Sequence, residues 1–156
     1  MEKLKKERII YPIRHSDWLS NPVIVRKKTG EIGMCVDFRD LNREIIKDNF
    51  SLPNTKFLLQ QVTTSACMSM LDVFSGYNQV FVAKKDREKT TFITPWETYA
   101  YAIIPFGLKN VGATFQRAMD HAFNRLIGNF MEDYQDDLMI QSKKREDRIH
   151  HLRKVF

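Results

Sequence analysis

Apolar side chains occupy both faces of one short segment, residues 67–72, where Met68 and Met70 alternate with Cys67, Ser69 and Leu71. A strand that is covered on both faces has this composition, so we predict a central strand of a sheet. Asp72 ends this strand, and an unpaired carboxylate at the end of a buried strand is costly. The pattern therefore favours a metal ion or a basic group beside Asp72.

A β-hairpin is predicted in the N-terminal part of the chain. Residues 23–25 and 34–38 have the apolar content of its two strands, and residues 29–31 supply the turn. Three consecutive basic residues, 26–28, lie on the limb that leads into this turn. This limb is either a solvated hairpin tip or a flap whose cationic groups meet phosphates.

A second hairpin is predicted at residues 131–140, with the sequence Tyr-Gln-Asp-Asp at its turn. Neighbouring strand residues point to opposite faces, so at most one of Asp136 and Asp137 faces a given site unless the turn redirects the other. An Asp-Asp pair in a turn is most often a solvated loop. A metal site needs a further carboxylate, for which Asp72 is the candidate.

Helical periodicity is strongest in residues 111–127, which are followed by a suitable stop at Gly128 and Asn129. A shorter helix is predicted at 54–62, and a last amphipathic segment places three apolar residues on one face, Ile149, Leu152 and Phe156.

Further strands are predicted at residues 79–82, 91–94 and 99–104, whereas residues 1–20 and 40–48 show little periodicity. Strands and helices follow one another without regular alternation. We therefore predict an α+β fold, with helices on one face of a largely antiparallel sheet.

Composition and charge narrow the class of protein. The chain has 156 residues and 43% apolar content, enough for one domain with a real core. Its net charge of +6 favours a polyanionic partner without requiring one. Neither a signal peptide nor a membrane-spanning stretch is visible. We expect an intracellular protein, cytoplasmic or nuclear, that is not secreted and has no membrane partner.

Two cysteines and a histidine pair are candidate ligands of a different kind. Cys35 and Cys67 lie in apolar settings without a Cys-x-x-Cys pair, which predicts buried, reduced thiols of a cytosolic or nuclear protein. His150 and His151 would diverge by about 100° on a helix. No Cys or acid stands at ligand spacing from them, so we interpret both as surface residues.

Five stretches, taken together and in this order, resemble the motifs of reverse transcriptases of the kind that gypsy-type LTR retrotransposons encode. A lone Tyr-x-Asp-Asp is weak evidence, but the order and spacing of all five are specific, and they cover roughly residues 16–156. The matching stretches are Met34–Asn42, Leu71–Gln79, Lys89–Phe92, Pro105–Arg117 and Tyr134–Asp137.

The resemblance implies one reverse transcriptase domain over residues 1–156. Its fingers, which are rich in β-structure, would cover about residues 1–47 and 81–110. Its palm, a ferredoxin-like antiparallel sheet with helices on one face, would cover about residues 48–80 and 111–156. Nothing after the palm hairpin resembles a thumb.

The resemblance also implies the chemistry of an RNA-directed DNA polymerase. Asp72 and Asp136 would ligate two Mg²⁺ ions with Asp137 assisting, and Mn²⁺ is an alternative ion. One ion would activate the primer 3′-hydroxyl for attack on the α-phosphate, and the other would neutralise the departing pyrophosphate.

Other roles are implied by position in the motifs. Lys27 would pair with the triphosphate of the incoming dNTP, and Tyr77 would exclude a ribose 2′-hydroxyl unless it is simply a core tyrosine. Phe106 and Gly107 would form the floor beneath the nucleotide. Gln116, on a helix whose other positions pack the core, would face the template-primer, as would Tyr134 and Gln135.

The sequence departs from the family pattern at three places. Ile32 and Gly33 stand where the family usually has Trp-Arg, which removes a contact to the triphosphate. Gln135 and Asp133 stand where apolar residues are usual. Asp133 is expected to face inward, and burying it unpaired could cost several kcal/mol.

The expected partners are an RNA or DNA template-primer, dNTPs, and the rest of a Pol polyprotein with its thumb, ribonuclease H and integrase. The departures, together with the missing thumb, predict a partial or decayed copy. Two alternatives stay open: a non-catalytic nucleic-acid-binding or interaction domain that keeps the fold, and a basic globular domain whose acidic hairpin has no role. Metal-dependent dNTP incorporation separates these functions.

Overall fold

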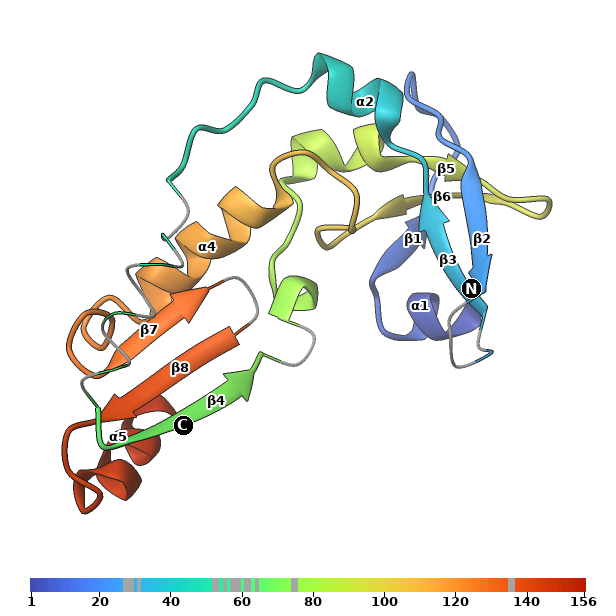
Figure 1. Cartoon of the computed structure of the whole chain (residues 1–156). Helices are drawn as coiled ribbons and strands as arrows, with labels where there is room; N and C mark the ends of the chain where they lie inside the picture. The colour runs from blue at the N-terminus through green and yellow to red at the C-terminus, as the bar shows by residue number, and fades with distance from the viewer. Residues whose placement is uncertain are drawn as a thin grey trace. The chain divides into compact units, whose positions relative to one another are not determined.

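A computed structural model describes residues 1–26, 30, 32–51, 54, 56, 60, 63, 65–73, 76–134 and 137–156. The chain divides into two compact units (Figure 1). Unit 1 consists of Met1–Lys47 and Tyr77–Val111, and unit 2 of Asp48–Gly76 and Gly112–Phe156. Each unit joins two segments that are distant in the sequence. The assignment of fingers and palm to these segments stays a prediction, and the helix predicted at 54–62 lies mostly outside the described residues.

Unit 1 contains two antiparallel sheets. The strands β1 (Ile10–Pro12), β5 (Phe92–Ile93) and β6 (Thr98–Tyr101) form one sheet in the order β1-β6-β5. The strands β2 (Pro22–Arg26) and β3 (Ile32–Val36) form the other, in a register that pairs Pro22 with Val36. The predicted N-terminal hairpin and the paired strands near residues 92 and 99 are thus confirmed.

Three short helices in unit 1 have no counterpart among the predicted elements: α1 (Glu2–Lys6), α2 (Arg39–Glu44) and the 3₁₀ helix η2 (Lys84–Thr90). A helix of one or two turns shows too few apolar repeats for periodicity to reveal it. Packing holds α2 instead, since its Leu41 belongs to the core of unit 1. That core is formed by Ile9, Ile10, Val36, Phe38, Leu41, Phe92, Tyr99, Tyr101 and Ile103.

The prediction of a strand at residues 79–82 is wrong. Gln79, the first residue of the predicted strand, belongs to the 3₁₀ helix η1 (Gly76–Gln79). Phe81 forms only an isolated bridge to Ile103. The Val82 amide still donates to the Ala102 carbonyl at 3.0 Å. The segment therefore makes strand-like contacts, although they are too few to form a strand.

The described part of unit 2 contains a three-stranded antiparallel sheet (Figure 1). The strands β4 (Cys67–Asp72), β7 (Met131–Tyr134) and β8 (Asp137–Ser142) lie in the order β4-β8-β7. The predicted C-terminal hairpin is therefore confirmed, with β8 in the centre.

The helices α4 (Val111–Ala122) and α5 (Asp147–Val155) contact the same face of this sheet. Gln116 of α4 donates to Asp133 of β7, and Arg148 of α5 donates to Ser69 of β4. The register places Ser69 beside Ile140 and Asp133 beside Leu138, and Leu138 and Ile140 share one face of β8. The α+β architecture with helices on one face of an antiparallel sheet is confirmed.

The prediction that β4 is a central, doubly buried strand is wrong. Among the described residues it is an edge strand of the sheet, and Met70 is 59% exposed. Alternation reports which residues share a face, but the element that covers a face comes from elsewhere in the chain. Asp72 is exposed too, so the cost of burial does not apply to its carboxylate.

Several other predictions also need correction. Helix α4 ends at Ala122, and the chain continues in turns up to Phe130. Ile149 and Phe156 are exposed, so the apolar stripe of the last helix is not buried in unit 2. Cys35 is exposed rather than buried. No helix among the described residues has the length and apolar content to cross a membrane.

Candidate active site

Two predicted catalytic acids meet at one end of the sheet in unit 2. Asp72 is the last residue of β4, Asp137 is the first residue of β8, and the register places them directly opposite each other. Directly opposed residues of antiparallel strands have Cβ atoms about 4.5–5.5 Å apart and share one face of the sheet. Both side chains are exposed. Strand pairing thus brings together two carboxylates that are far apart in the sequence.

The opposition of Asp72 and Asp137 is unfavourable for the protein alone. Like charges directly opposite each other destabilise a sheet. Among the described residues neither carboxylate has a hydrogen bond or an ion pair. An arrangement of this kind is satisfied by a cation, and carboxylate oxygens are the ligands that Mg²⁺ takes in proteins. Mutual repulsion of the two carboxylates, and not burial, is therefore what would favour a cation at this end of the sheet.

The third predicted metal ligand, Asp136, lies outside the described residues, as do Gln135 and Lys27. The described part of the chain contains no cluster of three or more histidine, cysteine, aspartate or glutamate side chains that could hold a metal ion. Two of the three predicted ligands are therefore placed together.

Tyr134 lies in the same row across the sheet. It ends β7 directly opposite Asp137, so the sheet carries Tyr134, Asp137 and Asp72 side by side on one face. Its side chain is half-buried. The predicted contact of Tyr134 with the template-primer stays a prediction, and its position beside the acids is compatible with it.

A close contact holds the chain just beyond Asp72 against α4. A Cβ atom on Gly76 would lie 2.7 Å from Cζ of Phe115 and 2.8 Å from Cγ1 of Val73. Both distances are shorter than van der Waals contact allows, so this position requires glycine. Phe115 itself is buried. The end of β4 is thereby fixed to the core of unit 2.

A buried polar network lies between α4 and β7. Gln116 is 1% exposed and Asp133 2% exposed, and Nε2 of Gln116 donates to Oδ2 of Asp133 at 2.6 Å. The same amide group lies 3.1 Å from Oδ1 of Asp120. Asp133 thus faces inward, as expected, but it has a hydrogen-bond partner, so the cost of burial without a partner does not apply. The side chain of Gln116 faces the interior, and the predicted template-primer contact of its helix stays a prediction.

Burial and neighbouring negative charge disfavour the ionised forms of Glu132 and Asp133 in β7. Burial, and then the charge of Asp120, raise the pKa of Asp133, while the hydrogen bond from Gln116 opposes this shift. Burial, followed by the charge of Asp133, also raises the pKa of the neighbouring Glu132. Oε1 of Glu132 has no hydrogen-bond partner among the described residues. Two adjacent buried carboxylates thus reduce the stability of unit 2 at neutral pH.

The predicted nucleotide contacts that the structure describes lie in unit 1. The rings of Tyr77 and Phe106 have centroids 4.9 Å apart and are tilted by 59°. Phe106 is 68% exposed, which leaves an aromatic face open to a ligand. Gly107 has φ +98, a conformation that side chains other than glycine rarely adopt. No side chain therefore blocks the approach to the backbone at this turn.

Asn42 holds the turn that carries Phe106 and Gly107. Its amide nitrogen donates to the Gly107 carbonyl, and its amide oxygen accepts from the Lys109 backbone amide, both at 2.7 Å. The Lys109 ammonium group also donates to the Ile45 carbonyl at 2.8 Å. Sequence reasoning missed this role, although Asn42 ends one of the five motifs and an asparagine can offer a donor and an acceptor together.

The chain matches the model of the family described as reverse transcriptase (RNA-dependent DNA polymerase) over residues 25–156. It is 33% identical over 161 residues to the retrovirus-related Pol polyprotein from transposon gypsy of Drosophila melanogaster. That match covers 100% of this chain and 16% of the relative. It is 35% identical to an RNA-directed DNA polymerase homolog of Oenothera berteroana, covering 78% of this chain and 88% of the relative.

Solved structures support the fold. The foamy viral protease-reverse transcriptase in complex with RNA/DNA hybrid matches with a TM-score of 0.87 at 18% sequence identity. The match covers 99% of this chain and 20% of that chain, so the chain corresponds to a small part of the foamy viral enzyme. The chain therefore belongs to the reverse transcriptase (RNA-dependent DNA polymerase) family, and within it is similar to the domain that gypsy-type Pol polyproteins carry.

Proposed function

We propose that this chain is the fingers and palm of an RNA-directed DNA polymerase of a retrotransposon, which extends a primer 3′-hydroxyl with dNTPs on an RNA or DNA template. The direct opposition of Asp72 and Asp137 at one end of the sheet carries this proposal. Both acids lie in stretches that resemble the family's catalytic motifs.

In this proposal Asp72, Asp136 and Asp137 hold two Mg²⁺ ions, with Mn²⁺ as an alternative. The ions, when bound, supply activation of the primer hydroxyl and neutralisation of charge on the departing pyrophosphate. The protein provides carboxylates whose mutual repulsion is relieved by cations and whose positions are set by strand pairing. Because β4 and β8 are held in register by six residue pairs, the two acids need little rearrangement to bind.

The roles proposed in unit 1 concern the incoming nucleotide. Lys27 pairs with its triphosphate, and Tyr77 excludes a ribose 2′-hydroxyl. Contact between the rings of Tyr77 and Phe106 would restrict the tyrosine to a narrow range of positions, which such exclusion requires. The turn at Gly107, held by Asn42, offers backbone close to the nucleotide. Tyr134, Gln135 and the helix that carries Gln116 are proposed to lie toward the template-primer.

The proposed partners are a template-primer, dNTPs and further segments of a Pol polyprotein, with thumb, ribonuclease H and integrase. The length of the gypsy relative and the foamy viral complex with RNA/DNA hybrid support this part of the proposal. The net charge of +6 is suited to nucleic acid. We place this function inside the cell, in the cytoplasm or nucleus.

Primer extension tests the catalytic proposal. The chain is incubated with poly(rA)/oligo(dT) and dTTP in Mg²⁺, then in Mn²⁺, and compared with Asp72→Asn and Asp136→Asn. We expect each variant to lose about a thousandfold or more of the incorporation rate, as removal of a catalytic group usually does. The matched control is Glu146→Gln, an exposed acid of the same unit outside the site, which should retain the rate. If the parent chain incorporates dTTP and Asp72→Asn incorporates it at the same rate, the proposal is refuted.

A second candidate function is binding of nucleic acid without catalysis, by a decayed copy that keeps the fold. The departures at Gly33, Asp133 and Gln135 favour it. Gly33 lies in β3 opposite Val25, so the hairpin forms without the arginine that usually contacts the triphosphate. A folded chain that binds template-primer without extending it would support this candidate. Extension restored by Gly33→Arg would identify the lost arginine as the cause.

A further inference from the structure

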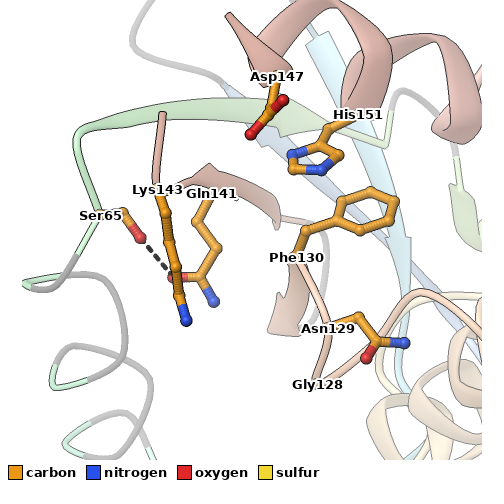
Figure 2. Close-up of a pocket in the computed structure, with 8 residues that line it drawn as sticks. All are labelled: Ser65, Gly128, Asn129, Phe130, Gln141, Lys143, Asp147 and His151. Carbon is orange, nitrogen blue, oxygen red and sulfur yellow. Dashed lines mark hydrogen bonds between the residues drawn. The ribbon is translucent and has the colours of Figure 1, made fainter. Parts of the chain in front are cut away.

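A pocket of about 420 Å³ lies in unit 2, and no role proposed above uses it (Figure 2). Gln141 and Lys143, at the end of β8, form part of its lining. Asp137 begins the same strand, four residues before Gln141, which corresponds to about 13 Å along an extended chain. The pocket therefore lies at the end of the sheet remote from the catalytic acids, and its volume falls in the range of small-molecule sites.

Two side-chain amides give this pocket a hydrogen-bond donor and an acceptor. Oε1 of Gln141 accepts from the Ser65 hydroxyl at 3.0 Å, so the amide NH₂ group remains to donate. Nδ2 of Asn129 donates to the Arg125 carbonyl at 2.9 Å, so its amide oxygen remains to accept. No other partner of these two free groups occurs among the described residues. Both residues line the pocket, and a donor together with an acceptor matches the edge of a nucleobase.

A stacked pair of rings forms another wall of the pocket. Phe130 and His151 have centroids 4.2 Å apart and planes 8° from parallel. Nδ1 of His151 lies 2.8 Å from the Ser142 hydroxyl, which fixes the orientation of the imidazole. Figure 2 shows these rings across the pocket from Gln141 and Lys143. Flat rings held in place this way offer a surface on which a base can pack.

Basic residues lie along one side of the pocket. Lys143 lines it, and Nζ of Lys154 lies 5.8 Å from the ring centroid of Phe130. Residues 143–154 contain six lysines and arginines against two carboxylates, and residues 143–150 are all exposed. Figure 2 shows Asp147 beside His151, across the pocket from Lys143. A phosphate therefore fits the Lys143 side, and a sugar hydroxyl, which can donate to a carboxylate, fits the Asp147 side.

We propose that this pocket binds a nucleotide, with its base toward Gln141, Asn129 and the stacked rings and its phosphate toward Lys143. The nucleotide is either free in solution or one unit of a nucleic-acid strand. A site that attracted only negative charge would need no amide pair and no aromatic wall. The combination of the three features in one pocket is what points to a base with a phosphate attached.

Direct binding to the full chain tests this proposal. The probes are AMP, GMP, CMP, UMP and a single-stranded dT12 oligonucleotide, each titrated by calorimetry in EDTA so that metal-dependent binding at the acids does not contribute. We expect saturable binding of at least one probe, weakened about tenfold by Lys143→Ala. Gln141→Leu should change the order of preference among the monophosphates. The matched control, Lys144→Ala, removes the same charge from an exposed neighbour outside the lining and should change Kd less than twofold.

The outcomes distinguish a free nucleotide from a nucleic-acid strand as the ligand, and they distinguish the pocket from the acidic site. Binding of a monophosphate assigns the pocket to a free nucleotide, and binding of dT12 alone assigns it to a strand. Asp72→Asn should leave either Kd unchanged, so failure of primer extension does not affect this test. If Lys143→Ala and Lys144→Ala weaken binding equally, the effect comes from overall positive charge and not from the pocket, and the proposal is overturned. Absence of saturable binding by every probe would overturn it as well.

Discussion

The polar side chains at the two ends of the sheet in unit 2 differ in whether they have hydrogen-bond partners. At one end Asp72 and Asp137 face each other, and among the described residues neither has a partner. At the other end Gln141 is bonded to Ser65, and Ser142 to His151. Side chains that hold a structure together are normally paired. An opposed pair of like charges is better explained by a ligand than by stability.

The same contrast appears in the charge along β8. The strand begins at Asp137 and leads, one residue past its end at Ser142, into the basic segment 143–154. One end of the sheet is therefore suited to cations, and the other to anions. If each end has its own ligand, substitutions at one end should leave binding at the other unchanged.

Replacement of Gly76 should have the largest effect on stability. Gly76→Ala places a Cβ atom 2.7 Å from Phe115, and the resulting overpacking should lower the free energy of unfolding by about 1–3 kcal/mol. Chemical denaturation followed by circular dichroism measures this change. Gly112→Ala is the matched control, because a Cβ there meets nothing within 4 Å and alanine favours the helix. A neutral Gly76→Ala would mean that the acidic end is not held by this contact.

Mg²⁺ should stabilise the chain through its acidic end alone. At a concentration ten times Kd, an ion that binds only the folded state adds about 1.4 kcal/mol to the free energy of unfolding. Thermal unfolding with and without Mg²⁺ measures this gain, which EDTA should remove. The gain should vanish in Asp72→Asn and persist in Glu146→Gln, an exposed acid just before α5. A gain of equal size in Asp72→Asn would place the ion elsewhere.

The buried acid Asp133 should produce a smaller effect that depends on pH. Its pKa is raised in the folded state, so the folded chain holds the proton more tightly than the unfolded chain. Stability from this group is therefore lost as pH rises from the unfolded pKa, near 4, through the folded pKa. Asp133→Asn should add roughly 1 kcal/mol at pH 7 and little at pH 4.

Denaturant titrations of Asp133→Asn and the parent chain at both pH values measure this difference. Asparagine keeps the oxygen that accepts from Gln116, so the packing is preserved. A gain of the same size at pH 4 and pH 7 would show that the charge of Asp133 is not its source.

Local patterns predicted the elements whose partners are close in sequence. The hairpin of β7 and β8 was predicted because its strands are adjacent and its turn residues are distinctive. The motif resemblance connected Asp72 to Asp137, which no local pattern could do. Pairing between β4 and β8 then supplied the register that places the two acids opposite each other.

Features that depend on distant partners were missed or misjudged. Alternation in β4 predicted burial on both faces, but the hydrogen bonds from α4 and α5, among the described residues, reach one face of its sheet. Gln116 and Asp133 were each singled out, yet their hydrogen bond depends on how α4 packs on β7. The contacts of Asn42 with Gly107 and Lys109 join segments more than 60 residues apart. Periodicity carries no information on such pairings.

The pairing of β4 with β8 has a consequence for synthesis of the chain. This strand must wait until β8 has left the ribosome, and Asp137 follows Asp72 by 65 residues. At about 5–20 residues per second the delay is roughly 3–13 s. Throughout it, a strand with Met68 and Met70 and unpaired backbone groups is open to other polypeptides. We therefore expect slow translation through residues 73–137 to increase aggregation of the nascent chain.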